Sequence, residues 1–226
     1  DCTFKGVFTN EYQKNKGVSD ENSAILLDDF RGKVHTIPFT TKNMMILDLK
    51  KPIASGAFVS RFDLEQLNQT LVKQTLTFDS GQADLRLAFK ADVVNLEMQK
   101  PFLIGSVVIQ NASGTHISSK KKFNNSSVDL SFTSKELKVN QIELNTQNSA
   151  LKMKGQSDNF LNFYYDTPEK IVLNWDIHAE KIDLRDFSFG SEKAASIKKS
   201  TKITPNVINI LHQSNATINL RAENIV

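Results

Sequence analysis

Hydrophobic and polar residues alternate along most of this chain, and the alternation is clearest in residues 171–187. There Ile171, Leu173, Trp175 and Ile177 occupy every second position, and polar residues fill the positions between them. Successive side chains of a β-strand point to opposite faces, so this period predicts a strand with one apolar and one polar face. The same pattern recurs through most of the sequence.

The alternation predicts a series of strands separated by short polar or glycine-containing turns. The expected strands are 2–10, 24–30, 32–40, 43–50, 56–62, 75–79, 82–95, 104–110, 114–119, 127–133, 137–145, 150–155, 170–180 and 215–225. Strands at this spacing, with few helices between them, favour antiparallel pairing over alternating strand–helix units. The sequence therefore predicts a mainly β protein with a curved antiparallel sheet. The pattern leaves open whether the strands form a sandwich, a barrel or an open groove.

Helical structure is expected at only three places. Residues 63–72 carry leucines at helical spacing behind an aspartate, a residue type that caps helix N-termini. A short helical segment is expected at about 158–165, and a third at 205–213, which begins with proline. Small and polar residues at 190–202 predict a flexible loop.

The length allows one large β domain or two small ones, and we expect a single β-rich domain over residues 1–226. A chain of 226 residues buries enough surface to fold without disulfide or metal staples, and it has one cysteine, Cys2. The net charge of +3 is too small to indicate a nucleic-acid partner. The chain opens on Asp1 and closes inside an alternating run, so we expect it to be an excised part of a longer protein.

No pattern in the sequence indicates catalysis or a cofactor. The four histidines are not spaced as metal ligands, and no nucleophile elbow or phosphate-binding glycine loop is present. The acidic pair Asp183 and Asp186 is interpreted as loop solvation, because such pairs in β-rich proteins are rarely glycosidase carboxylates. We therefore expect a non-enzymatic protein without a cofactor or a metal.

Several segments together resemble a known family. They are the PIASGAF segment at 52–58, the GQADLRL segment at 81–87, the NSALKMKG segment at 148–155 and AEKIDLRDF at 179–187. In this order, with a short helix after the first, they resemble the AsmA-like family of bacterial envelope proteins, which is related to TamB and YhdP. The best-matching stretches are about 48–95 and 126–187. The motifs are degenerate patterns and supply no catalytic positions.

The resemblance implies a location and a function. AsmA-like proteins are tethered to the inner membrane by an N-terminal helix and extend into the periplasm, where repeated β units curve into an apolar groove. They are thought to let phospholipids cross towards the outer membrane or to influence outer-membrane biogenesis. For this chain the resemblance implies a periplasmic domain involved in lipid transport or outer-membrane assembly, with phospholipid as its ligand. The N-terminal helix is not part of residues 1–226.

The alternating strands supply the candidate wall of such a groove. The candidate lipid-binding residues are Leu85, Leu87, Phe89, Val128, Leu130, Phe132, Leu173, Trp175 and Ile177. In a closed sandwich the same residues would be ordinary core. Trp175, the single tryptophan, is open to both interpretations: packing against residues 160–165, or contact with an acyl chain.

Two other functions are compatible with the pattern. The first is a scaffold that binds another envelope protein by strand addition at an exposed sheet edge. The second, which we rank lower, is a surface adhesin or glycan-binding sandwich. Adhesins of that type use exposed aromatic platforms or calcium-binding acidic loops, and the sequence shows neither.

Overall fold

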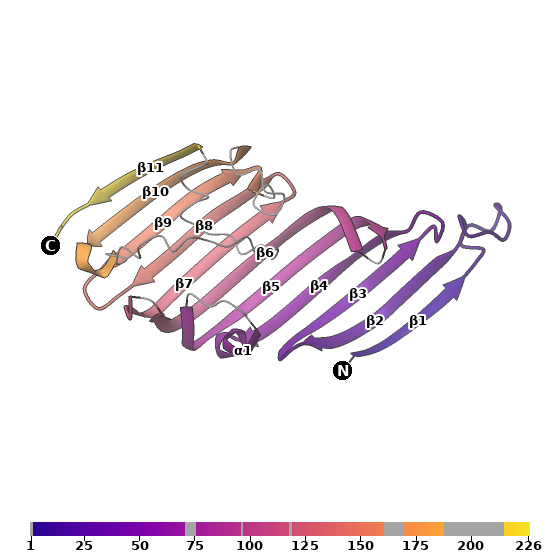
Figure 1. Ribbon diagram of the computed structural model, residues 1–226, viewed down its shortest axis with the longest axis horizontal. Coiled ribbons are helices and arrows are strands. Elements are labelled where there is room, and N and C mark those ends of the chain that lie inside the picture. The colour runs from indigo at the N-terminus through magenta and orange to yellow at the C-terminus, as the bar shows by residue number, and fades with distance from the viewer. Residues whose placement is uncertain (1, 71–75, 96, 118, 161–169, 188–214) are drawn as a thin grey trace, which may run out of the picture.

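The computed structural model shows the described residues as one eleven-stranded sheet in which each strand pairs with its neighbours in sequence (Figure 1). The structure describes residues 2–70, 76–95, 97–117, 119–160, 170–187 and 215–226. The strands are β1 (Cys2–Thr9), β2 (Ala24–Val34), β3 (Ile37–Leu47), β4 (Ile53–Asp63), β5 (Leu76–Val94), β6 (Glu97–His116), β7 (Lys122–Thr133), β8 (Glu136–Asn145), β9 (Ala150–Asp158), β10 (Val172–Lys181) and β11 (Asn215–Ala222).

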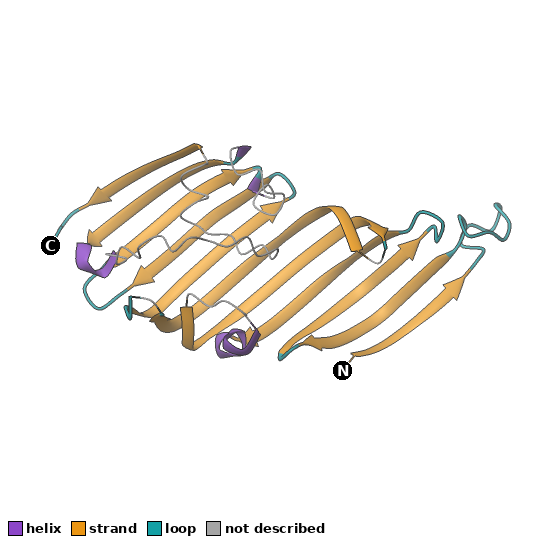
Figure 2. Ribbon diagram, in the orientation of Figure 1, coloured by secondary structure: helices purple, strands orange, loops and turns teal. Residues whose placement is uncertain are grey.

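The sheet is open, with β1 at one edge and β11 at the other. Pairing is antiparallel from β1 to β10, and only β10 and β11 run parallel. Figure 2 shows the described strands as a single twisted layer. The prediction of a mainly β protein with an antiparallel sheet is thus confirmed. The sequence left open a sandwich, a barrel or an open groove, and the described strands form an open sheet.

The first hairpin turn lies further along the chain than the alternation predicted. We expected a break near Arg31, but β2 continues to Val34 and the turn falls at His35, whose φ is 54°. Gly32 was expected to begin the second strand of this pair. Instead it lies inside β2, where it pairs with Phe39 of β3.

Three further expected breaks between strands are also wrong, because each lies inside a longer strand. The break expected between 32–40 and 43–50 lies within β3, where the register shifts between Lys42 and Met45. The other two are bulges inside long strands. The segment at Ser80 and Gly81 lies within the 19-residue strand β5, and residues 111–114 lie within the 20-residue strand β6. The register shifts at both places. A bulge places an unpaired residue in a strand, and Gly81 has a φ of 124°, which favours glycine.

The expected helix at 63–72 is confirmed in part. A 3₁₀ turn, η1 (Leu64–Gln66), leads into one turn of α-helix, α1 (Leu67–Thr70). Asp63 has extended backbone and makes no capping hydrogen bond through its side chain, so the expected N-cap interaction is absent. Residues 71 and 72 lie outside the described residues.

The other two expected helices are either not found where predicted or lie outside the described residues. In the segment predicted at 158–165, Asp158 is the last residue of β9 and Asn159 turns with a φ of 58°. Phe160 has 3₁₀ conformation, and residues 161–165 lie outside the described residues. The predicted loop at 190–202 and helix at 205–213 also lie outside them. A short 3₁₀ helix, η4 (Leu184–Phe187), follows β10.

Two small clusters of buried side chains hold the sheet at separate places. One combines Leu64 of η1 with Ala83 and Ala112, so the 3₁₀ turn covers the bulged parts of β5 and β6. The other combines Leu151, Ala179 and Ile182 near the C-terminal edge. Between these clusters, most apolar side chains of the sheet are half-buried, which is what a single layer allows.

Candidate functional site

The register of the strands places all nine predicted lipid-binding residues on one face of the sheet. Residues that pair directly across a ladder share a face, and so do residues two apart along a strand. Three rows cross from β5 to β10: Leu87–Gly105–Phe132–Leu137–Ser157–Leu173, Leu85–Val107–Leu130–Val139–Gly155–Trp175, and Ala83–Ile109–Val128–Ile142–Met153–Ile177. Phe89 pairs with Leu103 in the next row. We call this side of the sheet the apolar face.

An aromatic stripe extends the apolar face to the N-terminal edge. It consists of one phenylalanine from each of β1 to β5: Phe4, Phe30, Phe39, Phe58 and Phe89. Successive ring centroids lie 6.2, 5.3, 5.9 and 5.3 Å apart, the first three contacts edge-on and the last stacked. Aromatic pairs in these arrangements stabilise beyond the area they bury.

Sequence reasoning identified only Phe89 of this aromatic stripe. The signal that was available is the recurrence of at least one phenylalanine in each of five expected strands. That recurrence becomes meaningful only once the register is known, because the five residues stand at different distances from their turns.

On the apolar face, aromatic rings lie over glycines of the neighbouring strands. Part of this face is therefore covered without a second described layer. The cross-strand pairs are Gly32–Phe39, Gly56–Phe89, Gly105–Phe132, Gly114–Phe123 and Gly155–Trp175. In each pair a ring atom lies within contact distance of the place where the glycine would carry a Cβ. The rings therefore lie over the glycines, and Phe89 is only 6% exposed.

Trp175 illustrates the consequence for the candidate groove wall. Its Cδ1 atom would lie 3.0 Å from a Cβ added at Gly155, so the indole covers the neighbouring strand. The side chain is half-buried and belongs to the apolar face. Both interpretations of Trp175, core packing and acyl contact, are compatible with this position. Most of residues 160–165, its other expected partner, lies outside the described residues.

The opposite face of the sheet is mainly polar, although Val59, Phe102 and Ile104 are exposed on it. It carries most of the described ion pairs between strands. Asp84 of β5 accepts hydrogen bonds from Arg61 at 2.5 Å and from Arg86 at 3.2 Å. The hydrogen bond from Arg61 is the main cause that lowers the pKa of Asp84. A hollow of about 720 Å³ over this face is lined mainly by arginine, aspartate, glutamine and serine side chains, which suits water and polar groups more than an acyl chain.

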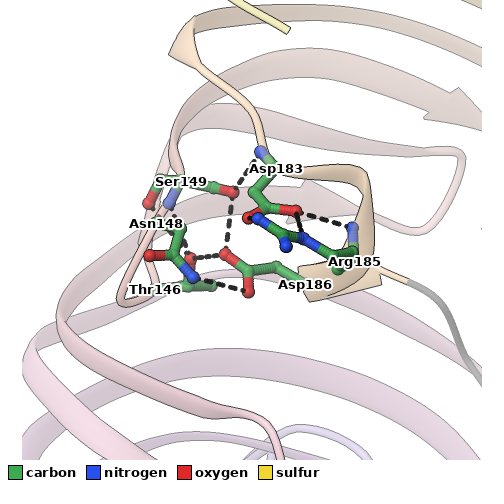
Figure 3. A network of polar contacts seen from close by, with 6 residues as sticks. All are labelled: Thr146, Asn148, Ser149, Asp183, Arg185 and Asp186. Atoms are coloured by element: carbon green, nitrogen blue, oxygen red, sulfur yellow. Dashed lines mark hydrogen bonds and ion pairs between the residues drawn. The ribbon is translucent and has the colours of Figure 1, made fainter. Parts of the chain in front are cut away.

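A network of polar contacts fixes the corner between the β8–β9 turn and η4 (Figure 3). The carboxylate of Asp186 accepts hydrogen bonds from the hydroxyls of Thr146 at 2.6 Å and Ser149 at 2.9 Å. Ser149 in turn accepts a hydrogen bond from the backbone N–H of Asp183. Burial raises the pKa of Asp186, but the hydrogen bonds from Thr146, Ser149 and Asn148 outweigh it and leave that pKa lowered.

The second half of this network is an ion pair within η4. Arg185 donates from Nε to Oδ1 of Asp183 at 2.8 Å and from Nη2 to Oδ2 at 2.6 Å. The side chain of Asp183 is 3% exposed and that of Arg185 is 76% exposed. The acidic pair Asp183 and Asp186 therefore anchors a corner of the fold, which corrects its interpretation as loop solvation.

The Asp183–Arg185 pair predicts a defined loss of stability in acid. The hydrogen bonds from Arg185 lower the pKa of Asp183 from 3.8 to about 2. Because the folded-state pKa lies below the unfolded-state value, the contribution is complete above about pH 4 and is lost as the pH falls to about 2. Urea unfolding midpoints of the wild type and Asp183→Asn should differ at pH 6 and converge at about pH 2. A difference that stays constant across this range would contradict the prediction.

The described residues offer few other sites. They contain no group of three His, Cys, Asp or Glu side chains that could hold a metal ion. Among the described helices, none has the length and apolar character of a membrane span.

Comparison of the chain with protein family models, curated proteins and solved structures finds no match. The fold and its two faces define an open, amphipathic β-sheet. The resemblance to AsmA-like proteins stays a prediction from sequence motifs.

Proposed function

We propose that this domain is a non-enzymatic AsmA-like module of the periplasm whose apolar face binds the acyl chains of phospholipid. In this role it would serve lipid transport or the assembly of the outer membrane. The observation that carries the proposal is the apolar face itself, which is continuous from the aromatic stripe to Ile177 across ten neighbouring strands. The opposite face is paired by charged and amide side chains.

The physical basis of binding is partition. Each acyl methylene removed from water contributes about 0.8 kcal/mol. Contacts of this kind are non-directional, so a chain is able to slide along the rows while its headgroup stays in water. Half-buried residues such as Leu130 and Phe132 retain surface that an acyl chain would cover. Such transport needs no nucleophile or metal.

A pair of charge substitutions tests the proposal. Leu130→Asp places a carboxylate in the middle of the apolar face, and Ser106→Asp places one on the polar face, where Ser106 pairs with Arg86 and Ser131. Both proteins are produced in bacteria with export to the periplasm, purified without detergent, and extracted for phospholipid analysis by mass spectrometry. Circular dichroism establishes that both are folded.

Wild type and Ser106→Asp should retain equal amounts of phospholipid, and Leu130→Asp should retain about tenfold less, because an unpaired charge on an apolar surface is costly. Folded wild-type protein without bound phospholipid would contradict the proposal. Equal loss in both variants would show that the effect does not depend on the apolar face.

A further inference from the structure

Three consecutive lysines, Lys120 to Lys122, lie where the chain turns from β6 into β7. Backbone hydrogen bonds fix this turn, because His116 donates to the carbonyl of Lys121 and accepts from the N–H of Lys120. Lys120 and Lys122 are exposed, and none of the three lysines forms an ion pair within the described part of the chain. Adjacent like charges repel each other, so an anion bound at this turn would be stabilised.

The fold brings the lysine turn next to η4, which lies much further along the chain. Phe123, the residue after the lysines, pairs with Thr146 of the β8–β9 turn. This pairing spans one strand spacing, about 4.8 Å. The hydroxyl of Thr146 then donates to Asp186 of η4 at 2.6 Å. Three segments distant in sequence therefore lie side by side at one end of the strands.

These segments carry a surplus of positive charge. We call residues 119–122, 146–149 and 183–187 the basic margin. Its charged side chains are Lys120, Lys121, Lys122, Asp183, Arg185 and Asp186. Asp183 is paired with Arg185, and Asp186 is held by neutral hydroxyl groups. The hydrogen bond from Arg185 is the main cause that lowers the pKa of Asp183, and the charge of Lys121 adds to it, which places this lysine near η4.

The apolar face begins directly beside the basic margin. Phe123 packs against the buried cluster beneath η1, and Ile182 belongs to the cluster near the C-terminal edge. Of the three apolar rows described above, the nearest to the margin contains Val128, Ile142 and Met153. These three side chains are half-buried, so they retain surface that an acyl chain would cover. Positive charge and apolar surface thus meet at one boundary.

The opposite margin of the sheet, at the β3–β4 and β7–β8 turns, lacks this combination. There Lys50 is paired with Glu21 at 2.6 Å. Lys51 and Lys135 lie in separate turns, and neither belongs to a run of lysines. The two margins therefore differ in their attraction for an anion.

We propose that the basic margin holds the phosphate of an anionic phospholipid headgroup while the acyl chains lie on the adjoining apolar face. The inference rests on the proposed function, since it needs acyl chains on that face. Lysine ammonium groups bind phosphate as point charges, and clustered lysines attract anionic lipids. A zwitterionic headgroup carries its own cation beside the phosphate, so it gains less from the margin.

Short-chain lipids that dissolve as monomers test the proposal by calorimetric titration. Phosphatidylglycerol and phosphatidylcholine with identical acyl chains differ in headgroup charge alone. Lys120→Glu/Lys122→Glu reverses two exposed charges of the basic margin. Lys51→Glu/Lys135→Glu reverses two exposed charges at the opposite margin and reaches the same net charge, so it is the matched control. Circular dichroism establishes that both variants are folded.

The wild type and the control should bind phosphatidylglycerol about tenfold more tightly than phosphatidylcholine, because several lysines act on one phosphate. Lys120→Glu/Lys122→Glu should lose this preference and keep its affinity for phosphatidylcholine. Equal affinity of the wild type for the two lipids, or an equal loss in both variants, would overturn the headgroup site and leave acyl binding intact. Binding of neither lipid would overturn the proposed function as well.

Glycerol phosphate separates a lipid site from a site for free phosphate esters. It carries the anionic group without acyl chains, so it should bind at least about tenfold more weakly than phosphatidylglycerol. Affinity equal to that of phosphatidylglycerol, lost in Lys120→Glu/Lys122→Glu, would show that the margin takes free phosphate esters. That result would overturn the assignment to lipid.

Discussion

Replacing Leu64 with alanine is expected to lower the free energy of unfolding by about 3 kcal/mol. Leu64 is fully buried, and it packs against Ala83 and Ala112 where β5 and β6 both carry bulges. A Cβ added at Gly81 would lie 2.7 Å from its Cδ1 atom, so the leucine fills the space that this glycine leaves. Truncation would leave a cavity at the place where the ladder is least regular, and the backbone there has little freedom to close it.

Urea unfolding measures this effect, and Leu184→Ala provides the matched control. Leu184 is also in a 3₁₀ turn at the end of the sheet but is 59% exposed, so its truncation should change stability by about 0.5 kcal/mol or less. A loss of similar size in the two variants would show that η1 does not hold the bulged strands together.

Replacing Gly105 with alanine is expected to lower the free energy of unfolding by about 2–3 kcal/mol. The new Cβ would collide with the backbone carbonyl oxygen of Arg86 and would lie 2.8 Å from the Cζ atom of Phe132. The carbonyl belongs to the adjoining strand and is not free to move, and displacing the ring would uncover part of the apolar face. The added methyl group therefore forces apart two central strands.

Ala57→Val is the control for this substitution. Ala57 is an exposed residue of the interior strand β4, and valine favours strand structure, so its stability should change by about 0.5 kcal/mol or less. A second effect separates the two variants. Only Gly105→Ala should raise the binding of a dye such as ANS, because only it lifts a ring off the apolar face.

The sequence predicted most strands and one face of the sheet correctly, because a period of two assigns each side chain to a face without any knowledge of its partners. The nine candidate residues fall on one face for this reason. The turns were harder to predict, since a glycine has several uses. Gly32 lies beneath a ring, and Gly81 forms part of a bulge, but both resemble turn residues in the sequence.

Features that depend on contacts between distant residues were not predictable. Thr146 and Asp186 are 40 positions apart, and nothing in either local sequence indicates that they meet. The aromatic stripe has a similar origin, because five strands must be in register before the rings contact one another. The parallel pairing of β11 depends on a crossover that periodicity does not encode.

The fold constrains the function without identifying the ligand. An open sheet with one continuous apolar face is suited to an extended apolar partner, and the proposal of phospholipid derives from the resemblance to AsmA-like proteins.

The fluorescence of Trp175 tests acyl binding to the apolar face most directly. It is the single tryptophan, and it stands in the middle row of that face, where its cross-strand neighbour is Gly155 and the next residue of the row is Val139. Titration with a phospholipid brominated on its acyl chain should quench this fluorescence in a saturable manner, and unlabelled phospholipid should reverse the effect by competition. A lipid brominated only at the headgroup should quench much less. Fluorescence that brominated acyl chains leave unchanged, in protein shown to be folded, would contradict the account.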